Sequence, residues 1–135
     1  MDLRKLDALV AEKVMGWKVR SETVPTYPKG MPMCSIKTLW FVTRPDGTEW
    51  GCTDDLDKTD LPRYSSSIEA AWQVRAQMYN VGFWCIVTYN ERGVTVAFDH
   101  EDGRGGQYTL KDVAQEPLAT VMAALEAEGV EVPEE

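Results

Sequence analysis

The residue best suited to acid–base chemistry is His100, the one histidine in the chain, which lies in the polar segment FDHEDGRGG. An imidazole beside a carboxylate can act as a general base, and Asp99 and Asp102 are its nearest acidic neighbours in sequence. A hydrolase also needs a nucleophile and a group that stabilises developing charge, and the sequence shows no motif for either. We therefore interpret His100 as a solvated turn residue and expect no catalytic residues. A small hydrolase that uses His100 with a nearby carboxylate is the alternative.

Two clusters of carboxylates are the candidates for holding a metal ion. Their members are Asp54, Asp55, Asp57 and Asp60 in the first cluster, and Asp99, Glu101 and Asp102 around the histidine. A calcium loop needs oxygen ligands at fixed spacing and a glutamate at its twelfth position, and neither cluster has this pattern. We interpret both clusters as solvated charge runs, and we expect no metal and no cofactor.

Aromatic residues are the clearest candidates for binding. The chain has five tryptophans and five tyrosines, and aromatic rings can stack on bases, sugars and peptide side chains. Trp40 and Trp50 stand on the two arms of an expected hairpin with Arg44 at its turn, and the proline-rich segment nearby adds Tyr27 and Lys29. These five residues are the candidates for a ligand- or partner-binding surface. For the two tryptophans, we favour packing in the core over contact with a ligand.

Length and charge limit the classes of function. A chain of 135 residues with 44% hydrophobic residues suits a single domain, which we place at residues 1–135 with a tail at 130–135. The net charge of −8 argues against binding to nucleic acid or to an anionic membrane, because both select lysine and arginine. The charged start MDLRKLDALV is not a secretory signal, and no apolar run is long enough to span a bilayer. We expect a cytosolic protein with reduced cysteines, and a homo-oligomer is compatible with the sequence.

Periodicity and end signals locate the elements that would carry these residues. Apolar residues at helical spacing predict helices over residues 2–15, 66–80 and 116–128. Runs rich in β-branched and aromatic residues predict strands, which read TLWFVT, TEWGCT, FWCIVTYN and VTVAFD, with QYTL as a last fragment. The order α-β-β-α-β-β-α indicates an α+β sandwich, in which helices pack on an antiparallel sheet.

The core should form where the helices cover this sheet. Both faces of Phe83–Tyr89 are largely apolar, which predicts a central strand that is covered on both sides. Segment 21–33 contains three prolines and a glycine, so we expect it to be irregular for most of its length. The side chains that we expect to be buried are Leu6, Val10, Trp17, Trp72, Trp84, Val121 and Leu125.

The three helical segments together carry a resemblance to a known family. They are LDALVAEKVMGW at residues 6–17, YSSSIEAAW at residues 64–72 and PLA at residues 117–119. In this order they resemble the phage ABA sandwich domain family, small proteins encoded by phages and prophages of Gram-positive bacteria. The resemblance covers nearly the whole chain. It implies an α/β sandwich of phage or prophage origin that acts in the cytosol of the bacterial host, and it implies no catalytic residues.

The resemblance and the absence of a catalytic motif favour an accessory protein that binds a host protein or a small ligand. One specific form is sequestration of a nucleotide-derived defence signal of the host, with aromatic rings stacked on the base. Local cations would then hold the phosphate, and the candidates are Arg20, Lys29, Arg44 and Arg63. A pocket lined by tryptophan and arginine without histidine would favour binding. A deep pocket that holds His100 and carboxylates would favour the hydrolase.

Overall fold

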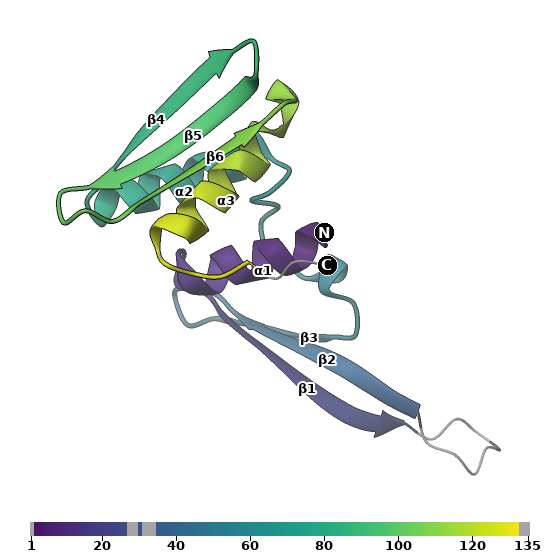
Figure 1. Ribbon diagram of the computed structural model, residues 1–135. Helices are drawn as coiled ribbons and strands as arrows, with labels where there is room; N and C mark the ends of the chain where they lie inside the picture. The colour runs from purple at the N-terminus through teal and green to yellow at the C-terminus, as the bar shows by residue number, and fades with distance from the viewer. Residues whose placement is uncertain (1, 27–29, 31–34, 133–135) are drawn as a thin grey trace.

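The computed structural model describes residues 2–26, 30 and 35–132 of the chain, and these residues form an α+β fold, as the sequence predicts (Figure 1). Asp2 and Ser67 cap the first two α-helices with their side chains, and Pro117 stands in the first turn of the third. In chain order the elements are α1 (Leu3–Lys13), β1 (Lys18–Thr26), β2 (Ser35–Thr43), β3 (Glu49–Thr53), the 3-10 helix η1 (Leu56–Lys58), α2 (Ile68–Asn80), β4 (Phe83–Asn90), β5 (Gly93–His100), β6 (Gly105–Leu110), the 3-10 helix η2 (Val113–Gln115) and α3 (Glu116–Ala127).

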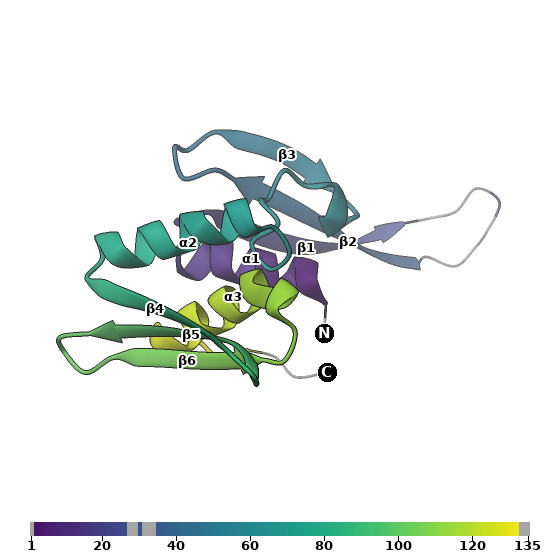
Figure 2. The ribbon, with the colours of Figure 1, turned by 90° about the horizontal axis from the view of Figure 1, so that it is seen from above.

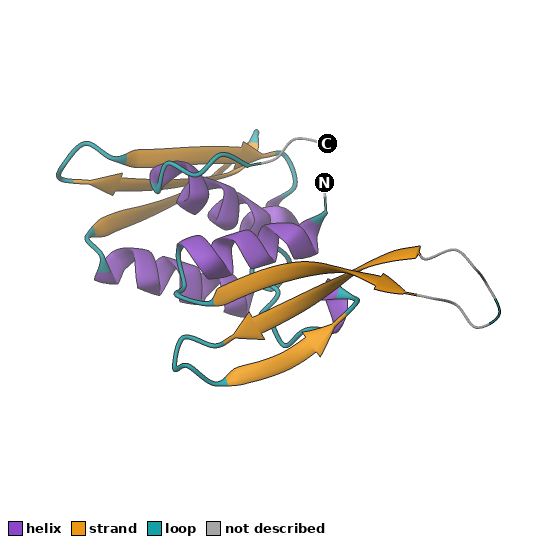
Figure 3. Ribbon diagram, turned by 90° about the horizontal axis from the view of Figure 1, so that it is seen from below, coloured by secondary structure: helices purple, strands orange, loops and turns teal. Residues whose placement is uncertain are grey.

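The described strands form two antiparallel three-stranded sheets rather than one. The strand order is β1-β2-β3 in the first sheet and β4-β5-β6 in the second. The helices lie between the sheets (Figures 1 and 3): α1 contacts β1, α2 contacts β4, and α3 contacts β5 and β6. The expected sandwich is therefore confirmed, but each half of the chain contributes its own sheet and the helices form the middle layer.

The proline-rich segment differs from its prediction. It was expected to be irregular, yet strand β1 continues through it as far as Thr26. Pro25 is accommodated because β1 is an edge strand that pairs with β2 alone. The distal ends of β1 and β2 extend away from the helices as a two-stranded ribbon (Figure 2), in which the side chain of Ile36 is exposed.

The core lies around the helix layer and the inner face of β5. Four aliphatic residues that the sequence places there, Leu6, Val10, Val121 and Leu125, are buried, and so is Trp17. They form one cluster with Val96 and Phe98 from β5 and with Tyr64 from the segment before α2. Val130 and Val132, which the sequence places in a tail, also pack against this cluster.

Strand β4 is not the central strand, covered on both sides, that its apolar residues predict. It lies at the edge of its sheet, and its outward-facing Trp84 and Ile86 are 52% and 56% exposed. Trp72 on α2 is 60% exposed. The prediction that both tryptophans are buried is therefore wrong, because the helices cover only one face of this sheet. Among the described helices, none is long and apolar enough to cross a membrane.

Candidate functional site

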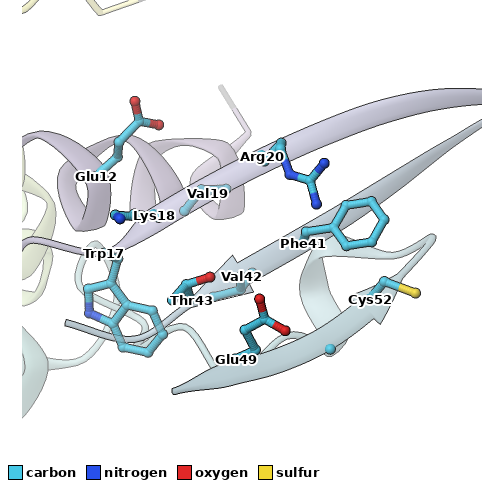
Figure 4. Close-up of a pocket in the computed structure, with 11 residues that line it drawn as sticks. Glu12, Trp17, Lys18, Val19, Arg20, Phe41, Val42, Thr43, Glu49 and Cys52 are labelled. Carbon is cyan, nitrogen blue, oxygen red and sulfur yellow. The ribbon is translucent and has the colours of Figure 1, made fainter. Parts of the chain in front are cut away.

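A pocket of about 590 Å³ lies on the first sheet, next to the loop that joins α1 to β1 (Figure 4). This volume falls within the range of roughly 300–1,000 Å³ that is usual for small-molecule sites. Three strands, the end of α1 and the loop contribute to its lining. The lining side chains best suited to binding are Trp17, Lys18, Arg20, Phe41, Thr43 and Glu49.

The register of the three strands creates the first row of side chains in the pocket. Arg20 on β1 lies opposite Phe41 on β2, and Phe41 lies opposite Cys52 on β3. Residues that are directly opposite in an antiparallel pair share one face, and successive residues alternate between faces. Since the neighbouring Val42 is buried against the core, this row faces away from it.

A second row runs parallel to the first and gives the pocket an electrostatic polarity. Lys18 on β1 lies opposite Thr43 on β2, and Thr43 lies opposite Glu49 on β3. The β1 side therefore carries two cations, Lys18 and Arg20, and the β3 side carries a carboxylate. Glu12 at the end of α1 adds a second carboxylate. The formal charges in the pocket cancel, although the whole chain has a net charge of −8.

Arg20 and Phe41 form a stacked pair at the centre of the pocket. The guanidinium carbon of Arg20 lies 4.3 Å from the centroid of the Phe41 ring, which is the geometry of a cation–π contact (Figure 4). The carboxylate of Glu22, two residues along β1, accepts a hydrogen bond from Arg20. Arg20 is thus held over the ring while its side chain stays more than half exposed to solvent.

Trp17 borders the pocket at the start of β1, and the structure holds it firmly. The turn after α1 contains Gly16, whose φ of +83° suits a residue without a side chain. The Trp17 backbone N–H then donates to the carbonyl of Ala11 at 3.0 Å. Burial raises the pKa of the neighbouring Tyr64 to about 12, and a side-chain hydrogen bond with Trp17 opposes this rise. Trp17 is 9% exposed, so only an edge of its indole can contact a ligand.

The residues predicted from the sequence do not gather in this pocket. Trp40 and Trp50 are partly buried and pack against the core. Trp50 occupies a bulge in β3, since Glu49 and Gly51 on either side of it pair with successive residues of β2. Arg44 donates from Nε to Asp60 Oδ2 at 2.8 Å. Tyr27 and Lys29 lie outside the described residues.

The sequence contains a signal for the pocket residues that were not predicted. Lys18, Val19 and Arg20 alternate as cation, apolar residue and cation, which is the period of a half-exposed strand. Arg20 was named as one of four candidate cations for a phosphate, and the structure places it in the pocket. Its partner Phe41 could not be identified, because the pairing depends on the register between two distant segments.

The acidic residues between 54 and 60 serve local structure. Asp55 accepts from the Asp57 backbone N–H at 3.0 Å and caps η1. Asp57 accepts from Arg63 at 3.0 Å. Asp54 lies 3.1 Å from the ammonium of Lys37, and their hydrogen bond lowers the pKa of Asp54. Across residues 2–26, 30 and 35–132, no group of three or more histidine, cysteine or acidic side chains could hold a metal ion.

His100 is not the solvated turn residue that the sequence predicts. It ends strand β5, and its largely buried ring meets Phe83 edge-on with the centroids 5.0 Å apart. Its Nδ1 accepts a hydrogen bond from the Asp102 backbone N–H at 3.1 Å, so the neutral ring carries its proton on Nε2. That nitrogen faces Gly82, where a Cβ would lie 2.6 Å away. The Asp102 backbone N–H therefore occupies Nδ1, and Gly82 packs against Nε2.

Asp102, a carboxylate close to His100, makes hydrogen bonds with another residue. Asp102 lies 3.0 Å from Nδ1, but it accepts from the backbone N–H of Arg104 at 2.9 Å and from Arg104 Nε at 2.7 Å. The backbone hydrogen bond is the main cause that lowers the pKa of Asp102. A hollow of about 380 Å³ beside His100 is lined by Glu101 and by neither aspartate. The larger pocket has tryptophan and arginine but no histidine in its lining.

The comparisons with known proteins agree with the fold. A family model described as Phage ABA sandwich domain matches residues 8–125, which is most of the chain. The match confirms the resemblance carried by the three helical segments, and the term sandwich fits the arrangement of two sheets around a helix layer. No curated protein and no solved structure matches the chain.

Proposed function

We propose a binding function without catalysis for this chain, which belongs to the phage ABA sandwich domain family. The ligand occupies the pocket on the first sheet and is not turned over there. The observation that carries the proposal is the Arg20–Phe41 pair: a guanidinium 4.3 Å from an aromatic centroid, inside a cavity of about 590 Å³ that has no histidine in its lining. An aromatic face beside an exposed cation offers stacking and charge recognition at one place.

The arrangement of charges supports a small anionic ligand with a planar ring. Its anionic group would lie at the β1 side, where Lys18 and Arg20 supply donors. Its ring would stack on Phe41. Hydrogen-bond donors on the ring would point to Glu49 and Glu12, because carboxylates only accept. A nucleotide has all three features, so the proposed ligand class is a nucleotide.

In a phage protein, such binding would serve to sequester a nucleotide-derived defence signal in the cytosol of the host. Sequestration requires affinity and no chemistry, which agrees with the committed hydrogen bonds of His100 and Asp102. The net charge of −8 repels an anion at long range, and only the two local cations oppose it.

The test is calorimetric titration of the purified chain with mononucleotides, cyclic nucleotides and dinucleotides. At least one should bind, and chromatography should recover it intact. Phe41→Ala and Arg20→Ala should each weaken binding by about tenfold or more, since each removes one part of the stacked pair. The matched control is Arg104→Ala. Arg104 also lies over a phenyl ring, 5.1 Å from the Phe83 centroid, and also pairs with a nearby carboxylate, but it is outside the pocket.

Binding in Arg104→Ala should equal that of the unchanged protein. Two results would contradict the proposal. One is an absence of binding across the whole panel, and the other is a bound nucleotide that is recovered hydrolysed. Unchanged affinity in both pocket variants would place the ligand elsewhere on the protein.

A further inference from the structure

The two sheets present four edge strands to solvent, and three of them carry features that hinder pairing with another strand. Strand β1 contains Pro25 and exposed charged residues. Strand β3 is five residues long and has the bulge at Trp50. Strand β6 is six residues long, against eight in β4, and begins with Gly105 and Gly106. Such charges, prolines, bulges and short lengths are the usual protections of sheet edges.

Strand β4 has none of these protections. Its eight residues, FWCIVTYN, include no charged residue and no proline. Its pairing with β5 is continuous from Phe83 opposite His100 to Asn90 opposite Gly93, without a bulge. Since β4 pairs with β5 on one side only, its other side presents backbone N–H and C=O groups that pair with no strand in the described sheets. A long, regular and uncharged edge of this kind is a template for another strand.

Apolar side chains surround this edge. Trp84, Ile86 and Tyr89 on β4 and Trp72 and Tyr79 on α2 are each more than half exposed. Tyr79 and Trp84 line the same hollow of about 380 Å³, so the helix and the strand contribute to one surface. A fully buried aromatic side chain covers about 150–250 Å², so the four aromatic side chains, each more than half exposed, offer about 500 Å² per chain. Two copies would cover about 1,000 Å² from side chains alone, which reaches the size of a specific interface.

The charges at the two ends of β4 favour its own antiparallel copy as the partner. Glu101 borders the hollow at the start of β4, and Asp99 pairs with Trp84 there. Glu91 and Arg92 lie in the turn just after the end of β4, and Arg92 is the one that can pair with a carboxylate of the partner. In an antiparallel pair of β4 strands, Arg92 of each chain approaches the partner's Glu101. Among the described residues, Arg92, Asp99 and Glu101 have no ion-pair partner within the chain.

We propose that this chain forms a two-fold symmetric dimer through β4. The two β4 strands pair antiparallel and join the two β4-β5-β6 sheets into one sheet of six strands. On the outer face, Trp84 and Ile86 of each chain then lie beside outward-facing residues of the partner's β4, while Trp72 and Tyr79 cover the flank. The same patch on both copies is what two-fold symmetry requires. The ligand pocket lies on the other sheet, so the dimer and the proposed function are independent.

The test compares two lysine substitutions on the outer face of the second sheet. Ile86→Lys places a charge in the middle of β4, and Gln107→Lys places the same charge on β6, at the opposite edge. Both positions are exposed in the single chain, so both variants should fold. Sedimentation of the unchanged protein should give twice the chain mass of 15.2 kDa. Ile86→Lys should raise the dimer dissociation constant at least about tenfold, and Gln107→Lys should leave it unchanged.

Hydrogen exchange distinguishes strand pairing from contact between side chains alone. In the dimer, the β4 amides that point away from β5 should be protected, and in Ile86→Lys they should exchange quickly. If Ile86→Lys fails to fold, Tyr89→Lys at the end of the strand takes its place with the same expectation. A monomer across the concentration series would overturn the proposal. So would a dimer that persists in a folded β4 variant or that leaves the β4 amides unprotected.

Discussion

Arg4 and Asp7 form an ion pair inside the protein, with Arg4 Nη1 donating to Asp7 Oδ2 at 2.9 Å. Both residues are buried, at 8% and 1% exposure. Arg4 Nη2 also donates to the Leu61 carbonyl at 3.0 Å, and Asp7 Oδ1 accepts from the Ser65 backbone N–H at 2.8 Å. The pair therefore joins one face of α1 to the segment that leads from the first sheet into α2.

Replacing Asp7 by alanine should strongly destabilise the protein. The change leaves the buried Arg4 guanidinium with the longer ion pair to Asp57 Oδ1, 3.4 Å from Nε, and removes the acceptor for Ser65. Breaking one partner of a buried ion pair costs about 3–5 kcal/mol, which urea unfolding would measure. Asp54→Ala is the control, because its ion pair with Lys37 is exposed and should cost less than about 1 kcal/mol. Equal costs for the two variants would show that burial adds nothing to the Arg4–Asp7 pair.

Stability should fall in alkaline solution because of Tyr64. Burial raises the pKa of this residue to about 12 in the folded state, whereas an unfolded tyrosine titrates near 10. The unfolded chain therefore releases the proton first as the pH rises. The contribution of Tyr64 to the free energy of unfolding is fully present below about pH 10. It falls by roughly 3 kcal/mol as the pH rises towards 12. Unfolding free energies over this interval should decline more steeply in the unchanged protein than in Tyr64→Phe, which has no proton to release. Equal slopes would contradict the assignment to Tyr64.

The parts of the fold that could be predicted from the sequence are those set by local signals. Apolar spacing located all three α-helices, and Asp2 and Pro117 marked where two of them start. The parts that could not be predicted depend on neighbours. Trp72 and Trp84 are of a residue type that is common in cores. They are exposed because Trp84 lies on the sheet face that the helices do not cover and Trp72 lies on the solvent side of α2. Pro25 lies within a strand only because that strand is at an edge.

The candidate site also combines residues that could be predicted from the sequence with contacts that could not. Arg20 could be named as a cation from its type, and the alternation around it indicates a strand. Its contact with Phe41 is a matter of register, since a shift of one residue would turn the ring to the core face. The inward packing of Trp50 also depends on the bulge in β3, which residue types alone do not reveal.

The two described cysteines should differ in their reactivity toward a thiol reagent. Cys52 is exposed in the pocket, while burial raises the pKa of Cys85 and so lowers its thiolate fraction. Cys34 lies outside the described residues, so the measurement uses Cys34→Ser. Near pH 8, Cys52 should be labelled at least about tenfold faster than Cys85, and mass spectrometry of peptides would assign each rate. A bound ligand should slow Cys52 alone, and equal rates in urea would confirm that the folded structure causes the difference.

Gly82 and His100 should be energetically coupled. Gly82 has a φ of +101°, and a Cβ there would lie 2.6 Å from His100 Nε2. Gly82→Ala therefore adds a clash with the imidazole to the backbone strain of about 1–2 kcal/mol. His100→Ala alone removes the edge contact with Phe83 and should cost about 1 kcal/mol.

In the double variant the imidazole is absent, so only the backbone strain and the lost aromatic contact remain. The combined cost should be smaller than the sum of the two single costs by about 1 kcal/mol or more, as measured by a double-mutant cycle in urea. Gly103→Ala gives the matched control: its φ of +93° imposes similar strain, but no atom lies within 4 Å of its Cβ position. Its cost should add to that of His100→Ala without coupling. Additivity in both cycles would mean that the backbone around Gly82 shifts to relieve the clash and that His100 does not restrict this turn.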